Sequence, residues 1–205
     1  MIALRPDASD FKVRFGNVIA SCRRPRAVLM ASGREAGNLL KKHFREKDQT
    51  NVNQLAPDRR AHYWLGVSRA VQVPVVEGDT AVSITIADPT LAQKVFGGTI
   101  VAKRARDLTI PIAPDAYGRT TAVFEAETGL KLFVLHAGGT ASNGKENILL
   151  AAARGQGIEV EYLLTPSVDQ KADPTALPEE KQFADSILAK ALEVQEHINR
   201  GEQNA

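Results

Sequence analysis

One seven-residue stretch has the spacing of a phosphate-binding loop. Residues 139–145 read Gly-Thr-Ala-Ser-Asn-Gly-Lys and fit the pattern GxxxxGK. In such a loop, backbone N–H groups bind phosphates and the lysine reaches the terminal ones. Glu146, however, stands where a serine or threonine should bind Mg²⁺, and its charge would repel phosphates. We therefore expect a glycine-rich loop without nucleotide hydrolysis, and a small nucleotide-binding enzyme that uses Gly139–Lys145 is the first alternative.

The other reactive side chains form no catalytic or metal-binding pattern. There is no HExxH motif and no GxSxG motif, and the histidines are far apart in the sequence. They are His43, His62, His136 and His197. A single cysteine, Cys22, excludes an internal disulfide. The sequence therefore predicts no catalytic residue, no bound metal and no cofactor.

Two groups of basic residues could contact the phosphates of DNA. Such contacts need positive charge but no base-reading geometry. The net charge of +2 is too small for charge alone to drive binding to DNA or to a membrane, so any DNA contact must be local. The residues are Arg23 and Arg24 in the first group and Lys103, Arg104 and Arg106 in the second. They are candidate DNA-channel contacts, and a DNA-binding accessory protein is the second alternative.

Length and composition indicate a globular protein. A chain of 205 residues fits one domain with appendages, and 43% hydrophobic with 24% charged residues is ordinary globular usage. The N-terminal stretch carries charges throughout, and no window approaches 18 uninterrupted apolar residues. We therefore expect neither secretion nor membrane insertion, but synthesis and assembly in the cytoplasm.

Helical periodicity occurs towards both ends of the chain. Apolar residues spaced for one face predict a helix over Arg26–Glu46, with Leu40 and Phe44 in the core. Glycines at 33 and 37 weaken this helix, so a close neighbour is expected there. Asp58 could cap a second helix that ends by Val71, and Asp88 a short one over Thr90–Phe96. The last helix follows Pro178 and extends to Asn199, with a buried stripe of Phe183, Ile187, Ala191, Val194 and Ile198.

Alternating or continuous apolar runs predict the strands. Val71–Val76 and Ala81–Ala87 would form a hairpin across a Glu-Gly-Asp turn. Further strands are expected at Thr99–Ala102, Leu108–Ile112, Leu130–His136 and Ile158–Leu164. The fold class is then α+β: an antiparallel sheet packed by N-terminal helices, with a C-terminal helix after a proline-rich linker.

The expected organisation has four parts. Residues 1–25 form an N-terminal arm with one strand, residues 26–165 the α+β core, residues 166–178 the linker and residues 179–200 the C-terminal helix. That helix either docks on an adjacent subunit or folds back on its own core, and the sequence leaves both open.

A series of short segments, taken in order, resembles one known family. These segments are His43-Phe44-Arg45, Tyr63-Trp64, Gln93–Ile100 (QKVFGGTI), Leu108–Pro111 (LTIP), Ala116–Arg119 (AYGR), Tyr162–Leu164 and Ser167–Pro174. In this order the chain resembles the virion-morphogenesis and tail-completion (neck) proteins of Mu-like and related tailed bacteriophages. The resemblance covers roughly residues 27–200 and is weakest over Gly129–Gly157.

The resemblance implies a structural virion protein at the head–tail junction, as a neck, tail-completion or tail-terminator component. It implies a ring of copies around the DNA channel, with sixfold symmetry as the family expectation. The partners would be the chain itself, adjacent neck and tail proteins and the viral DNA, without any enzyme activity or cofactor. Uncovered sheet edges also need a neighbour. The expected assembly contacts are Phe96, Gly97, Gly98, Thr99, Ile100, Phe183 and Ile187.

Overall fold

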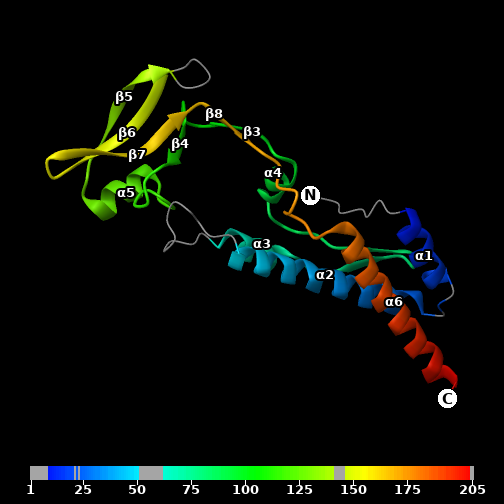
Figure 1. The fold of residues 1–205 in the computed structure, drawn as a ribbon. Coiled ribbons are helices and arrows are strands. Elements are labelled where there is room, and N and C mark those ends of the chain that lie inside the picture. The colour runs from blue at the N-terminus through cyan, green and yellow to red at the C-terminus, as the bar shows by residue number, and fades with distance from the viewer. Residues whose placement is uncertain (1–8, 21, 23, 51–61, 141–145, 204–205) are drawn as a thin grey trace. The chain divides into compact units, whose positions relative to one another are not determined.

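The chain is an α+β protein, as predicted, with helices at both ends and antiparallel strands between them (Figure 1). The computed structural model describes residues 9–20, 22, 24–50, 62–140 and 146–203. These residues form two compact units that cut across the predicted divisions. The helical unit comprises the described residues of 1–50, 62–96 and 172–205, and the sheet unit those of 97–171.

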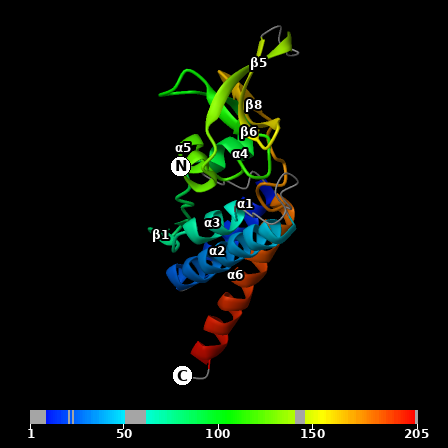
Figure 2. The ribbon, with the colours of Figure 1, turned by 90° about the vertical axis from the view of Figure 1, so that its left-hand side faces the viewer.

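The helical unit consists of five helices and one hairpin. α6 packs against α2 and α1, and α3 packs against α2 (Figures 1 and 2). The elements are α1 (Ser9–Ala20), α2 (Pro25–Thr50), α3 (Tyr63–Ala70), β1 (Val75–Glu77), β2 (Ala81–Ser83), α4 (Leu91–Phe96) and α6 (Glu180–Gln203).

The predicted face of α2 is buried, as the 3.6-residue spacing indicated. Leu40 and Phe44 lie in a core cluster with Trp64 and Val67 of α3. Phe44 stacks on Trp64 with ring centroids 6.0 Å apart. Two aromatic rings therefore anchor the contact between the two helices.

The prediction of an arm with one strand over residues 1–25 is wrong, because residues 9–20 form α1. Phe11, Phe15, Val18 and Ile19 follow the spacing i, i+4, i+7, i+8 of a helix face. These side chains pack with Leu188 and Ala191 of α6. Charged residues interleaved in the segment obscured its period.

Gly33 of α2 lies directly under the β1–β2 hairpin. A Cβ at this position would lie 2.6 Å from Val82 Cγ2 and 2.8 Å from Pro74 Cβ. The close neighbour expected from the sequence is therefore present at Gly33. At Gly37 it is absent, since a Cβ there would meet no heavy atom within 4 Å.

These two glycines give a matched pair of substitutions. Gly33→Ala should destabilise the helical unit by about 1–3 kcal/mol, because the hairpin must move to admit the methyl group. Gly37→Ala should instead stabilise it by up to about 1 kcal/mol, since alanine is the better helix former. Thermal unfolding of both variants beside the parent checks this. Equal shifts of the same sign would contradict the observed packing.

The sheet unit contains a four-stranded antiparallel sheet in the order β4-β7-β6-β5 and a two-stranded ribbon, β3-β8. The helix that packs on the sheet is α5: Phe124 lies against Tyr162, Ala152 and Ala116. The elements are β3 (Gly98–Val101), β4 (Leu108–Pro111), α5 (Thr121–Thr128), β5 (Leu132–Thr140), β6 (Glu146–Arg154), β7 (Gly157–Thr165) and β8 (Ser167–Gln170).

Three elements of this unit differ from the prediction, and the first is β6, since no strand was expected over Glu146–Arg154. The linker over 166–178 is only partly correct, because Ser167–Gln170 form β8 and pair with β3. α5 was not predicted at all, although Thr120 Oγ1 accepts a hydrogen bond from Val123 N–H and Gly129 ends the helix with a positive φ. The strands expected around residues 99–102, 108–112, 130–136 and 158–164 are all present.

Candidate functional site

The first group of predicted assembly residues lies together on an exposed segment. Phe96 ends α4 with 70% of its surface exposed, and Gly97 and Gly98 both have positive φ. Ile100 and its neighbour Val101 are exposed on β3, which among the described strands pairs only with β8. Thr99 donates a side-chain hydrogen bond to Asp169 across the ribbon. We call Phe96–Val101 the ribbon segment.

The second group, on α6, lies inside the protomer. Ile187 is buried, and Phe183 packs on the core cluster that holds Leu40 and Phe44. Of the two alternatives for the last helix, the structure therefore has it folded back on its own unit. Phe183 remains partly exposed, and the assembly contacts expected of Phe183 and Ile187 stay a prediction.

The basic residues are exposed but belong to two different units. Lys103, Arg104 and Arg106 lie on the loop between β3 and β4, where Arg106 Nε is 3.8 Å from Asp107 Oδ2. Arg24 is exposed just before α2, whereas Arg23 lies outside the described residues. The loop is thus a compact group of three cations on the surface of the sheet unit.

The GxxxxGK stretch connects two antiparallel strands. Gly139 and Thr140 end β5, and Glu146 begins β6, which pairs with β5. Residues 141–145, including Lys145, lie outside the described residues. A phosphate loop places a helix N-terminus after the glycines. Here a strand follows, which is not the layout that phosphate binding needs.

Two of the histidines, His43 and His62, make structural contacts. His43 Nε2 lies 3.1 Å from the carbonyl of Thr175, and burial lowers the pKa of this imidazole. His62 Nδ1 lies 2.8 Å from Asp48 Oδ2, and Asp48 Oδ1 also accepts the Leu65 N–H. Among the described residues, no group of His, Cys, Asp and Glu could hold a metal ion, and no helix is long and apolar enough to cross a membrane.

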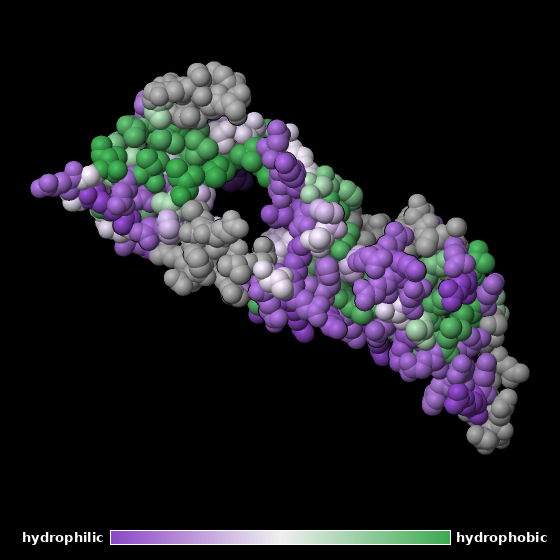
Figure 3. All heavy atoms as spheres, viewed as in Figure 1, coloured by the Kyte–Doolittle hydropathy of each residue, from purple (hydrophilic) through white to green (hydrophobic). Residues whose placement is uncertain are grey.

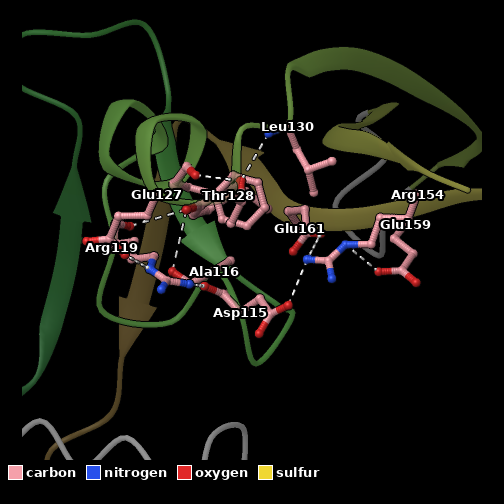
Figure 4. A network of polar contacts seen from close by, with 11 residues as sticks. Asp115, Ala116, Arg119, Glu127, Thr128, Leu130, Arg154, Glu159 and Glu161 are labelled. Atoms are coloured by element: carbon pink, nitrogen blue, oxygen red, sulfur yellow. Dashed lines mark hydrogen bonds and ion pairs between the residues drawn. The ribbon is translucent and has the colours of Figure 1, made fainter.

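A polar network around Arg154 fixes the turn before α5 to the sheet (Figure 4). The guanidinium contacts three carboxylates: Asp115 Oδ2 at 2.7 Å, Glu159 Oε2 at 2.9 Å and Glu161 Oε1 at 3.3 Å. Nearby, Arg119 Nε donates to Glu127 Oε2 at 2.6 Å. The sequence did not indicate this network, because Arg154 and its partner Asp115 are 39 positions apart.

Glu161 is the unusual member of this network. It lies at a β-bulge, between the pairs Leu150–Tyr162 and Ala151–Val160, and is completely buried. Its Oε2 has no hydrogen-bond partner among the described residues. Burial raises the pKa of the Glu161 carboxyl, although the Arg154 guanidinium opposes this. The arrangement therefore disfavours the charged form of the Glu161 carboxyl.

A raised folded-state pKa makes a definite pH prediction. The pKa of the Glu161 carboxyl is higher in the folded chain than in the unfolded chain, where it is near 4.5. The stability that this group contributes is therefore present below pH 4.5 and lost as the pH rises through the folded-state pKa. As the pH rises above 4.5, the Glu161→Gln variant should therefore become more stable than the parent by an increasing amount. Denaturant unfolding below and well above pH 4.5 measures the difference in the free energy of unfolding between variant and parent. A difference that does not grow with pH would contradict the raised pKa of Glu161.

Comparison of the chain with protein-family models, with curated proteins and with solved structures finds no match.

Proposed function

We propose that this chain is a structural subunit of a tailed-bacteriophage virion. It acts at the head–tail junction, as a neck, tail-completion or tail-terminator component, and its copies form a ring around the DNA channel. The ordered resemblance of its segments supports this proposal. The observation that carries it is the exposure of the ribbon segment, which a neighbouring subunit would cover.

The ribbon segment has the properties of an assembly contact. An isolated two-stranded ribbon is only marginally stable in water, and its outer edges offer unpaired backbone groups to another chain. β3 and β8 form such a ribbon, and every residue of β3 is exposed. Phe96 and Val101 add apolar surface at its two ends. A ring would cover this surface in every subunit, because each copy presents it to the next.

The test supplies variants to phage that lack the gene. Phe96→Asp should fold and melt like the parent, because the side chain is exposed, but heads and tails should fail to join. The matched control is Val73→Asp, which places the same charge at another highly exposed apolar side chain, 76% accessible. This control should join heads to tails normally.

The proposal is wrong if Phe96→Asp virions assemble normally. It is also wrong if density maps of intact virions place the chain away from the head–tail junction.

A DNA-facing role for the β3–β4 loop is a second candidate, which its three exposed cations favour. Each lysine or arginine that contacts a phosphate contributes roughly one unit to the slope of log K against log salt. Arg104→Ala should therefore weaken DNA binding equally across sequences and lower that slope by about one. An unchanged slope would remove this residue from any DNA contact.

A further inference from the structure

We infer that two copies of this chain pair through the second face of the four-stranded sheet. The inference concerns the free protein and does not depend on the proposed place in the virion. It uses a surface different from the ribbon segment, so both contacts can exist in one assembly.

The pairing registers separate the two faces of the sheet. Residues paired across an antiparallel ladder point to the same side, and successive residues alternate. The first face carries Leu132, Leu150 and Tyr162, which pack under Phe124 of α5. The second face carries an apolar row across all four strands: Ile110, Leu163, Leu149 and Leu135.

This second face is mostly apolar, and the registers place two uncharged polar residues on it, Asn147 opposite Ala137 and Thr165 opposite Leu108. Phe133 and Ile158 lie beside the row, paired with Ala151 and Ala153. No charged residue occupies any position that the registers place on this face in the described strands. Antiparallel sheets usually alternate apolar-in with polar-out. β6 instead reads as a continuous apolar run, which is typical of a strand covered on both sides.

The large side chains of the second face are accessible to a partner. Phe133 is 39% and Ile158 60% exposed, and all four residues of the row are partly exposed. On the first face, by contrast, Tyr162 and Phe124 are fully buried. Figure 3 shows hydrophobic side chains gathered over the strands of this sheet. Contiguous apolar patches of this kind mark interaction surfaces.

The chemistry of the face favours a second copy as its occupant. Without charges it offers no electrostatic feature by which a different partner would be selected. A pleated apolar face is best matched by another such face about 10 Å away, and a second copy supplies an identical one. From strand spacing and rise, the face covers about 500 Å² per copy, or about 1,000 Å² for the pair. That total is about the minimum for a specific interface.

Adjacent residues of β5 provide the test. Phe133 points to the second face and Val134, which is 54% exposed, to the first. Sedimentation of the full-length chain should show a dimer. Phe133→Lys should weaken association by at least about thirtyfold, the size of a hot-spot loss, while Val134→Lys leaves it unchanged. Ile158→Lys, at a still more exposed position, gives a second disruption with little risk to folding.

A parent chain that is monomeric at all concentrations would overturn the pairing, whatever its role in the virion. So would equal effects of Phe133→Lys and Val134→Lys, or association that survives both Phe133→Lys and Ile158→Lys with circular dichroism unchanged. A chain that dimerises but never enters virions would leave the pairing intact and refute the proposed function instead. The two failures are therefore distinguishable.

Discussion

Phe44→Ala is expected to lower the free energy of unfolding of the helical unit by about 3–5 kcal/mol. The Phe44 ring is fully buried, stacks on Trp64 and meets His43 edge-on at 5.6 Å. Its removal deletes apolar contacts and leaves a cavity that α2 and α3 fill only in part. Domains are stable by only about 5–15 kcal/mol, so the loss is a large fraction of the total.

Trp64, the single tryptophan, stacks on Phe44, so its fluorescence measures unfolding next to the substituted site. Denaturant midpoints from its fluorescence and from circular dichroism should fall together. Phe96→Ala is the matched control, because it removes the same ring from an exposed position and should change stability by less than about 0.5 kcal/mol. A Phe44→Ala midpoint equal to that of the parent would show that α2 does not bury this face.

Arg154→Ala is expected to destabilise the sheet unit by about 3–5 kcal/mol. The substitution leaves the carboxylate of Glu161 buried without its cation, while Asp115 and Glu159 lose their shared partner. Hydrogen exchange of the β6 and β7 amides should accelerate strongly, whereas α2 and α6 should exchange as in the parent. Exchange that rises equally in both units would contradict a local role.

The double substitution Arg154→Ala with Glu161→Gln separates charge from packing. If the penalty comes from the stranded carboxylate, the double variant should regain most of the lost stability. The Arg154→Ala loss should also shrink at acidic pH, because Glu161 is then protonated in both states. A double variant as unstable as Arg154→Ala alone would show that the arginine acts through its packing.

The elements that sequence analysis predicted are those whose signals are local. The period of Leu29, Leu40 and Phe44 indicated α2, and the Asp88 cap indicated α4, where Asp88 Oδ1 accepts N–H bonds from Thr90 and Leu91. α1 was missed because charges interrupt its apolar face. α5 was missed because its apolar face is weak, and Phe124 is its only buried residue. The residues that cap the helix were its only signal in the sequence.

The candidate surfaces were only partly predictable, for a physical reason. The end of α4 at Phe96 followed from the two glycines after it, which are local features. The burial of Ile187 depends on whether α6 meets α2, a contact between residues far apart in the chain. The Arg154 network and the apolar row of the sheet depend on strand register, which a sequence does not state.

The helical unit is built from separate stretches of the chain, so it can be completed only after its last stretch has been translated. The sheet unit ends at residue 171, whereas α6, which packs Leu188 and Ala191 against Val28 and Leu29 of α2, is synthesised after it. On the ribosome, the sheet unit can therefore reach its native state while α2 still lacks its partner helix. Throughout that interval the side of α2 that α6 later covers is exposed, and a chaperone or a protease can act on the incomplete chain there.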